Sequence, residues 1–319
     1  MNVMAPFVAT SSNATTNGPG NLMALSVTGL TKRYKSGFML DDITFDLPAG
    51  YIMGLIGPNG AGKSTLIRLI LNMTRRDAGS IDVFGLDAIA DEETVKGRIG
   101  VVFDANCFID AWTVGKTGRA MRDMYSAWDA ARFDDCLRRF GLDRSTRVGA
   151  LSRGMQMRLM LAVALSHHAR LLILDEPTAG LDVLARDDLM DLLRDYVADC
   201  EAGVLFSTHI TADLERSADL ITYITGGRLY YTGPKDEFED SFRIVRGGPD
   251  DLTDGLVALA LGIRRYDTGF DALVRAERAG ALAAASRTGG HVLVVEPAGI
   301  DDIVRLTNMP ADIEEGWQS

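Results

Sequence analysis

The sequence has little cysteine: three residues in 319, namely Cys107, Cys136 and Cys200. Their spacing fits neither a zinc site nor a disulfide framework. Hydrophobic residues make up 47% of the chain, so a protein of this length buries a sizeable core without either device. Widely spaced thiols are typical of a reducing compartment, and we expect a cytoplasmic protein.

The sequence also lacks a long apolar run. Its most apolar stretches are residues 51–56, 159–165 and 171–174. All are far shorter than the ~20 apolar residues that a membrane-spanning helix needs. The first basic residue is Lys32, so the charged start of a secretory signal is missing as well. We expect a chain that does not cross a membrane by itself.

Positive charge is in deficit. The chain has 33 Lys and Arg against 44 Asp and Glu, a formal net charge of -11. Nonspecific nucleic-acid binding relies on Lys and Arg neutralising phosphates, so we expect no nucleic-acid partner. The negative net charge does not exclude a small phosphorylated ligand, because a few backbone N–H groups can hold a phosphate whatever the net charge.

Three regions follow one another along the chain. Residues 1–21 carry no charged side chain and are predicted to be a disordered tail, with Met23 as a candidate start. Residues 22–240 alternate strand and helix patterns, which indicates an α/β domain, and residues 113–168 within it are helical. Strand patterns at 242–245, 269–274 and 291–295, with helix patterns at 252–261 and 300–306, predict a small α+β domain over residues 241–319.

A glycine-rich loop separates the predicted strand 51–56 from a predicted helix. It fits the phosphate-loop pattern G-x-x-x-x-G-K-[ST] with Gly57, Pro58, Asn59, Gly60, Ala61, Gly62, Lys63 and Ser64. In such a loop the N–H groups turn inward on phosphate oxygens, Lys63 reaches the β and γ phosphates, and the Ser64 hydroxyl ligates Mg²⁺. We count the next residue, Thr65, among the nucleotide-binding residues.

Two carboxylates follow the apolar strand 171–174. Asp175 at the strand end suits Mg²⁺ binding, directly or through water. Glu176 beside it is placed to orient or deprotonate an attacking water molecule. Two solvated acids after a core strand are the alternative explanation.

Further motifs resemble those of ATP-binding cassette (ABC) ATPases. The segment Leu151-Ser152-Arg153-Gly154-Met155-Gln156 resembles the signature motif of that family, and Ser152 is also a plausible helix cap. Ala179-Gly180-Leu181-Asp182 resembles its D-loop, and Ser207-Thr208-His209 its switch histidine. Tyr34 resembles the aromatic residue that stacks on adenine, although it would equally pack on the sheet. The resemblance covers about residues 22–235.

The resemblance implies a fold and a mechanism. The fold is a P-loop NTPase of the ABC type, with a mixed sheet, helices and a helical subdomain at about residues 105–168. Two such domains pack head to tail, and each ATP lies between the glycine loop of one copy and Ser152 and Gly154 of the other. Mg²⁺ accompanies ATP, and His209 contacts the γ-phosphate. Asp182 links the two ATP sites, or simply caps the following helix.

The sequence departs from the family pattern at two positions. Arg153 stands where the usual signature has Gly, and Asp104 follows the predicted strand 99–103 where the family has Gln. Asp104 is a candidate ligand for Mg²⁺ or contact for the attacking water. The apolar and aromatic residues that follow it, in segment 107–114, are predicted to form part of a docking groove for a membrane subunit, or to pack within the helical subdomain.

The favoured interpretation is the ATP-hydrolysing subunit of an ABC transporter, typical of an exporter with a separate membrane permease. It would lie at the inner face of the cell membrane, bound to that permease, and pair with a second ATPase subunit, identical or different. The alternative is a soluble ABC ATPase that acts on ribosomes or in assembly. A regulatory module that only senses ATP is disfavoured by Lys63, Asp175, Glu176 and His209 occurring together, and a GTPase by the missing guanine-reading motif.

Overall fold

The structure is a computed structural model that describes residues 22–200, 202–280 and 292–309. The predicted tail, residues 1–21, lies outside these ranges. The chain separates into two units, one ending at Thr232 and the other beginning at Gly233. The acidic stretch before the expected boundary at residue 240 is the helix α8 (Lys235–Asp240), which belongs to the second unit. Its buried Phe238 packs edge-on against Phe242 of the second unit, with ring centroids 5.6 Å apart.

The larger sheet has ten strands in the order β5-β4-β1-β2-β10-β9-β3-β8-β7-β6. The strands β1, β2, β4 and β5 pair antiparallel, and β9, β3, β8, β7 and β6 pair parallel. Their bounds are β1 Met23–Arg33, β2 Met39–Pro48, β3 Ile52–Ile56, β4 Ala78–Val83, β5 Leu86–Asp87, β6 Ile99–Val102, β7 Leu171–Asp175, β8 Gly203–Ser207, β9 Leu220–Thr225 and β10 Arg228–Pro234.

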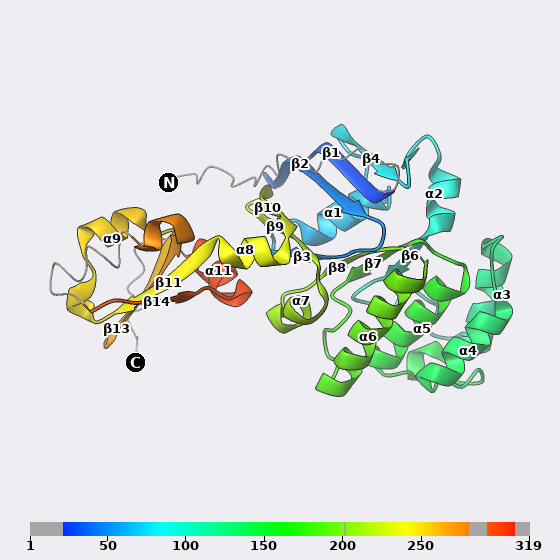
Figure 1. Ribbon diagram of the computed structural model, residues 1–319. Helices are drawn as coiled ribbons and strands as arrows, with labels where there is room; N and C mark the ends of the chain where they lie inside the picture. The colour runs from blue at the N-terminus through cyan, green and yellow to red at the C-terminus, as the bar shows by residue number, and fades with distance from the viewer. Residues whose placement is uncertain (1–21, 201, 281–291, 310–319) are drawn as a thin grey trace. The chain divides into compact units, whose positions relative to one another are not determined.

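Helices cover the parallel strands from both sides. In Figure 1, α1 lies between these strands and the antiparallel strands β1, β2 and β4, whereas α3 to α6 lie on the opposite side. The helices of this unit are α1 Lys63–Ile70, α2 Glu92–Arg98, α3 Val114–Met124, α4 Ala130–Phe140, α5 Arg153–Ser166, α6 Val183–Cys200 and α7 Thr211–Ser217, with a 3₁₀ turn η1 at Val148–Ala150. Strands covered in this way are apolar throughout, and every residue of β3, β7 and β8 is buried. The α/β fold expected from the sequence is confirmed.

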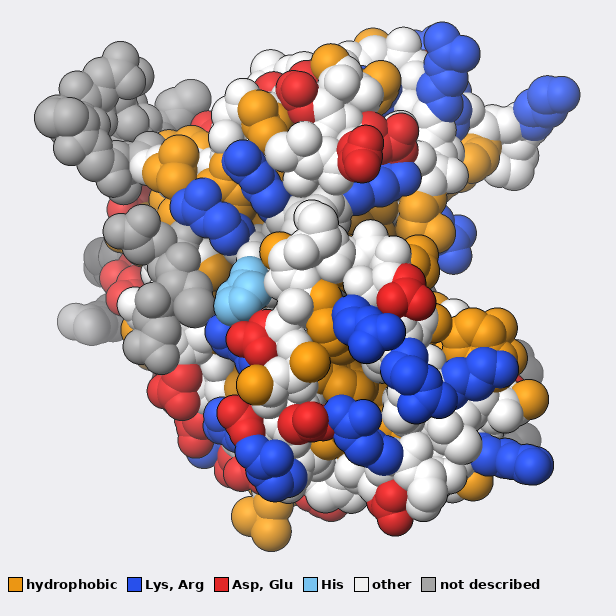
Figure 2. Space-filling model, turned by 90° about the vertical axis from the view of Figure 1, so that its right-hand side faces the viewer, with side chains coloured by type: hydrophobic (Ala, Val, Ile, Leu, Met, Phe, Trp, Pro, Cys, Tyr) orange, Lys and Arg blue, Asp and Glu red, His pale blue; other side chains and the backbone are white. Residues whose placement is uncertain are grey.

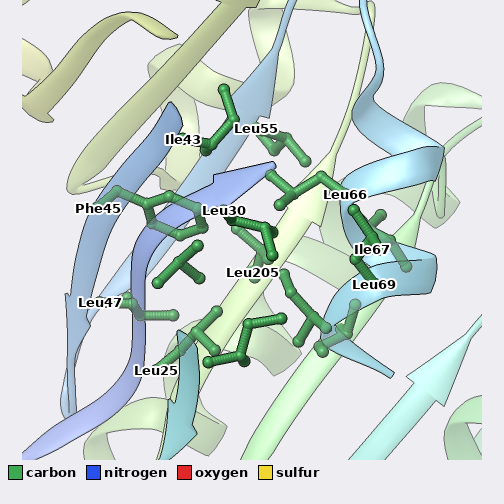
Figure 3. Packing of buried hydrophobic residues seen from close by; sticks show 14 of the residues in the cluster. Leu25, Leu30, Ile43, Phe45, Leu47, Leu55, Leu66, Ile67, Leu69 and Leu205 are labelled. Atoms are coloured by element: carbon green, nitrogen blue, oxygen red, sulfur yellow. The ribbon is translucent and has the colours of Figure 1, made fainter. Parts of the chain in front are cut away.

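The main core lies between α1 and the two halves of the sheet. Leu25 and Leu30 of β1 and Phe45 of β2 point toward Leu66 and Leu69 of α1 (Figure 3). Leu205 of β8 meets them from the parallel half of the sheet. This packing holds the start of α1 against β3, so the loop that joins the two is supported on both sides.

Side-chain caps begin the helices of the expected helical subdomain. Thr113 accepts a hydrogen bond from the Lys116 N–H and begins α3, and Asp129 accepts one from the Arg132 N–H and begins α4. Ser152 accepts one from the Met155 N–H at 3.3 Å and begins α5, so the cap predicted at Ser152 is confirmed.

The second unit has a four-stranded antiparallel sheet in the order β12-β13-β11-β14. Its elements are α8, β11 Phe242–Gly247, the 3₁₀ turn η2 Pro249–Asp251, α9 Asp254–Leu259, β12 Gly262–Tyr266, β13 Gly269–Arg275, β14 Val294–Pro297 and α11 Ile300–Thr307. The helix predicted at 252–261 is shorter, because Thr253 caps its start. The strand predicted at 291–295 begins at Val294, and residue 291 lies outside the described ranges. Ile300, Ile303 and Leu306 form the buried face of α11.

A buried histidine ends α5. The His167 ring stacks on Tyr125, with centroids 4.0 Å apart and planes at 7°. Burial lowers the pKa of His167 to about 4. The unfolded chain therefore takes up this proton at a higher pH than the folded one does. The contribution of neutral His167 to stability is complete above the unfolded pKa of 6.5 and is lost as the pH falls toward 4.

We expect the free energy of unfolding to fall by about 2 kcal/mol between pH 7.5 and pH 5 on account of His167. The His167→Phe variant keeps an aromatic ring against Tyr125 and removes the titrating group. Its free energy of unfolding should therefore fall by about 2 kcal/mol less than that of the parent between pH 7.5 and pH 5. Urea unfolding at the two pH values measures both free energies. Arg119→Gln, at an exposed residue of α3, is the control and should behave like the parent. Equal acid losses in the parent and in His167→Phe would contradict the assignment.

Candidate functional site

The phosphate loop joins β3 to α1 with backbone conformations that glycine allows. Gly57 has φ of +151° and Gly62 has φ of +113°. A Cβ on Gly57 would lie 2.1 Å from the Ile224 carbonyl oxygen, and a Cβ on Gly62 would lie 2.6 Å from Leu40. The loop therefore fits only without side chains at these positions. Between them Asn59 and Gly60 are exposed and Pro58 is half-buried, whereas Ala61 is buried.

Lys63, the first residue of α1, is 7% exposed. Its ammonium donates hydrogen bonds to the carbonyl oxygens of Gly57 at 2.6 Å and Pro58 at 3.3 Å. Burial lowers the pKa of Lys63, and the nearby carboxylates of Glu176 and Asp175 oppose that shift. The structure thus brings the loop lysine and the two predicted carboxylates to one place.

Asp175 ends β7 and is buried. One carboxylate oxygen accepts a hydrogen bond from the Ser207 hydroxyl at 2.6 Å. The same hydroxyl accepts from the Glu176 N–H at 2.9 Å. Ser207 lies at the end of β8, opposite Asp175 in the parallel pairing. Sequence reasoning did not single out its hydroxyl, although its position one residue before Thr208-His209 was a usable signal.

Glu176 and His209 form a pair. The Glu176 Oε2 atom lies 2.6 Å from His209 Nδ1. Glu176 has φ of +51°, a left-handed conformation that costs of order 1–3 kcal/mol in a residue other than glycine. Its N–H is held by both the carbonyl and the hydroxyl of Ser207. Its side chain is 19% exposed and that of His209 is 58% exposed, so both reach the surface beside the phosphate loop.

Oxygen donors suited to Mg²⁺ occur at the same place. Ser64 is exposed in the first turn of α1, and Thr65 follows it half-buried. In the described part of the chain, no group of three or more His, Cys, Asp or Glu side chains could hold a metal. A Mg²⁺ ion that binds together with a nucleotide does not need such a group of side chains, because one or two protein oxygens, water molecules and phosphate oxygens complete its octahedral coordination. Ser64 and Asp175 fit that donor set.

Tyr34 lies in the turn between β1 and β2, where its backbone bonds to Phe38 and Gly37. The residue is 36% exposed, and the centre of its ring lies 6.2 Å from that of Phe38. Phe38 in turn lies 3.0 Å from the Cβ position of Gly62. Phe38 therefore lies between Tyr34 and the phosphate loop, and the Lys32 ammonium lies 5.7 Å from the centre of the Tyr34 ring. The partial exposure of Tyr34 is compatible with stacking on a base.

The remaining predicted residues lie on α5 and α6. Ser152 is exposed at the N-terminus of α5, and a Cβ on Gly154 would lie 2.9 Å from Leu181. Asp182 is exposed and caps α6, accepting from the Ala185 N–H at 2.8 Å. The capping alternatives for Ser152 and Asp182 are thus both realised in this structure, and neither excludes a ligand contact.

The two positions that depart from the family pattern contact each other. The Arg153 guanidinium donates to the Asp104 carbonyl oxygen at 3.1 Å. Asp104 and Arg153 also line a small recess that includes Gly154, Glu176 and Leu181. Asp104 is exposed and shares this recess with Glu176, and among the described residues it belongs to no group of three or more His, Cys, Asp or Glu that could hold a metal.

A buried parallel strand, a glycine loop, a helix and two consecutive carboxylates at the end of a second buried strand define a nucleotide-binding domain of the P-loop class. The sequence pattern described as "ABC transporter" matches residues 40–179. The daunorubicin/doxorubicin resistance ATP-binding protein DrrA of Streptomyces peucetius is 30% identical over 91% of this chain and 94% of its own length. The Nod factor export ATP-binding protein I of Rhizobium leguminosarum bv. viciae is 37% identical over 72% of this chain and 78% of its own.

A solved structure of an ATP-binding subunit of an ABC transporter superposes with a TM-score of 0.63, at 30% identity, over 68% of this chain and 92% of that one. The chain belongs to the family of ABC transporter ATP-binding proteins. Members of this family bind ATP and are ATPases. Across residues 22–200, 202–280 and 292–309, no helix has the length and hydrophobicity to span a membrane.

Asp104 gives a test of the metal site. If its carboxylate helps to hold Mg²⁺, Asp104→Ala should raise the Mg²⁺ concentration needed for half-maximal ATP hydrolysis while ATP binding changes little. Asp104→Gln places the usual family residue there and should restore the parent titration. Asp123→Ala, at an exposed acid on α3, is the control. A Mg²⁺ titration of Asp104→Ala that overlays the parent would remove Asp104 from the site.

Proposed function

We propose that the chain is the ATP-hydrolysing subunit of an ABC exporter whose membrane permease is a separate protein. The observation that carries the proposal is the Glu176–His209 pair beside Lys63 of the phosphate loop. That arrangement has the parts for hydrolysis and not only for binding. The relatives named above for drug resistance and Nod factor export support the direction of transport.

The phosphate loop and Lys63 bind the β and γ phosphates of ATP, with Tyr34 stacked on adenine. Since Lys63 is buried, its attraction to phosphate is weakly screened by water. Ser64 and Asp175 would hold Mg²⁺, which supplies positive charge at the phosphate oxygens. The N–H groups of the first turn of α1 add donors, because no side chain caps that helix.

Glu176 is the general base. Its carboxylate takes a proton from a water molecule as the water oxygen bonds to the γ-phosphorus. The bond from that phosphorus to the bridging oxygen breaks, and ADP and phosphate result. His209 holds one Glu176 oxygen through Nδ1, and its other ring nitrogen is available to the γ-phosphate. Such a base contributes ~10²–10⁴-fold to the rate.

Hydrolysis requires a second copy, or a related ATPase, that supplies Ser152 and Gly154 to the γ-phosphate. The positive end of α5 begins at Ser152 and suits that role. Beside the D-loop, Val183 and Leu184 are 70% and 77% exposed at the start of α6. Apolar side chains that exposed, next to Asp182, fit a face that is covered by a partner.

Glu176→Gln keeps the shape of the base and removes its charge. We expect it to bind ATP, to turn over at least ~10²-fold more slowly than the parent, and to accumulate as an ATP-loaded dimer. Lys63→Ala should stay monomeric, because the contact to the shared phosphates is lost. Size-exclusion chromatography with and without ATP distinguishes these states, with Glu93→Gln on the exposed face of α2 as the control. Hydrolysis by Glu176→Gln at the parent rate would place the base elsewhere.

The docking surface for the permease is the segment 107–114 together with α3. Ile109 is 52% exposed and Met124 is 73% exposed, and the Lys116 ammonium lies 4.6 Å from the centre of the Trp112 ring. Residues 105–168 carry ten Lys and Arg against six Asp, in a chain that is acidic overall. Figure 2 shows the face of the molecule on which α3 lies, and there Lys and Arg side chains gather beside apolar ones. An apolar segment with acidic flanks on the permease would fit this surface.

This surface predicts which substitution separates the chain from its membrane partner. When the full chain is purified from membranes in mild detergent, an integral protein should come with it. Ile109→Asp should reduce that recovery severalfold, because it places a charge in the apolar contact. Met73→Asp, at a residue that is 60% exposed outside the segment, should not. Recovery of the parent only from the soluble fraction with ribosomes would support the alternative of an ATPase not coupled to transport.

We assign residues 22–232 to the ATPase domain, with its helical subdomain at about 105–168, and the chain from residue 233 to an accessory domain. The boundary expected at residue 240 moves to 232 because α8 belongs to the second unit. The accessory domain has its own core, which includes Val245, Phe270 and Val274. It is therefore not needed for ATP binding, and it contributes to self-association or regulation. The permease holds the protein at the cytoplasmic face of the cell membrane.

A further inference from the structure

The loops that carry Glu176 and His209 meet at one buried carboxylate. Asp213 accepts a hydrogen bond from the Thr178 hydroxyl at 2.6 Å, and the Thr208 hydroxyl lies 3.3 Å from the same oxygen. Thr178 is two residues after Glu176, and Thr208 immediately precedes His209. All three residues are buried: Thr178 is 0% exposed, Thr208 is 1% exposed and Asp213 is 4% exposed.

The helix that carries Asp213 is fixed in place. Its next residue, Leu214, lies against Gly54 of β3, so closely that a Cβ on that glycine would be 2.1 Å from Leu214 Cδ2. Arg216 forms an ion pair with Asp187 of α6. Since β3 leads into the phosphate loop and α6 follows the D-loop, α7 holds Asp213 in a frame shared with the nucleotide site.

A carboxylate is an expensive residue to bury, and here hydroxyl groups are its partners. Among the described residues no Lys, Arg or His forms an ion pair with Asp213. An apolar side chain would fill this space at lower cost if packing were the only requirement. The acid instead ties Thr178 to Thr208, and the Thr208 oxygen also accepts from the Ile210 N–H at 3.0 Å. The two loops are therefore joined behind the Glu176–His209 pair.

We propose that Asp213 is a positioning residue for ATP hydrolysis: by joining Thr178 and Thr208 it sets the separation of Glu176 and His209. The inference rests on the proposed function, in which Glu176 is the base. Glu176 already has a left-handed backbone. A loop in that conformation relaxes unless neighbours hold it, so the link through Asp213 matters for the carboxylate that must meet the water. ATP binding depends on the phosphate loop, which Asp213 does not touch.

The test separates turnover from binding in the full-length chain. Asp213→Ala should lower kcat ~10–100-fold, the cost of a misplaced catalytic group, while the Kd of ATP stays within about twofold and one ATP still binds per chain. Asp213→Asn keeps an oxygen that both hydroxyls can reach and should retain most of the turnover. Thr178→Val should reproduce the loss, and Thr178→Ser should not. The double variant Asp213→Ala/Thr178→Val should be no slower than Asp213→Ala alone, because both remove one link.

Ser217→Ala is the matched control. Ser217 is buried on the same short helix, and its hydroxyl has no hydrogen-bond partner among the described atoms, so its loss should leave kcat unchanged. If Asp213→Ala does not fold, the contrast between Thr178→Val and Thr178→Ser decides alone. Parent-like turnover in Asp213→Ala or Thr178→Val would overturn the inference while the ATPase assignment stands. A parent chain that binds ATP but never hydrolyses it, even with its permease, would instead overturn the proposed function.

Discussion

The site depends on the parallel register of three buried strands. Leu55 of β3 pairs with Ser207 of β8, and Ser207 pairs with Asp175 of β7. The three strands therefore end at the same level, and the residues that follow them, the phosphate loop, Glu176 and Thr208-His209, all emerge at one edge. A shift of one residue in β7 would turn the Asp175 side chain to the other face of the sheet. The strands are apolar on both faces, so the polar contacts at their ends hold the register: the Ser207 hydroxyl donates to Asp175 at 2.6 Å and accepts from the Glu176 N–H at 2.9 Å.

The sequence alone was sufficient for those parts of the fold and site that are contiguous along the chain. The glycine loop, the apolar strands and the Ser152 cap are each a few neighbouring residues whose chemistry is local. The sequence alone could not show contacts between residues that are distant along the chain and meet only in the folded protein. Asp213 looks like an ordinary acid on a short helix until the fold brings Thr178, 35 residues away, to its carboxylate. The sequence analysis placed the end of the first domain at residue 240 because five of the six residues 235–240 are charged. The boundary lies earlier because the sixth, Phe238, is buried in the second unit.

The two residues that depart from the family pattern, Arg153 and Asp104, are joined by a hydrogen bond. A glycine at position 153 could not reach the loop that follows β6, whereas the guanidinium does so by a hydrogen bond to a main-chain carbonyl. The first residue of α5 is thereby linked, within one chain, to the loop that leads into the helical subdomain. The bond is exposed, and such a bond contributes only about 0.5–1.5 kcal/mol. It biases the orientation of α5 toward β6 without locking it, which would suit the proposed role of Ser152 at the start of this helix.

The distribution of charge along the chain affects how two copies would associate. The chain as a whole is strongly acidic, yet α5 belongs to the segment 105–168, in which basic residues exceed acidic ones. A head-to-tail pair would therefore present a basic segment of one copy to the phosphates bound by the other, while the acidic remainder opposes association. Exposed charges are screened beyond about 8 Å at physiological ionic strength, so this attraction acts only when the surfaces are already close. The repulsion between the acidic surfaces is screened in the same way, so under the proposed function short-range contacts to the γ-phosphate would decide whether the pair is closed.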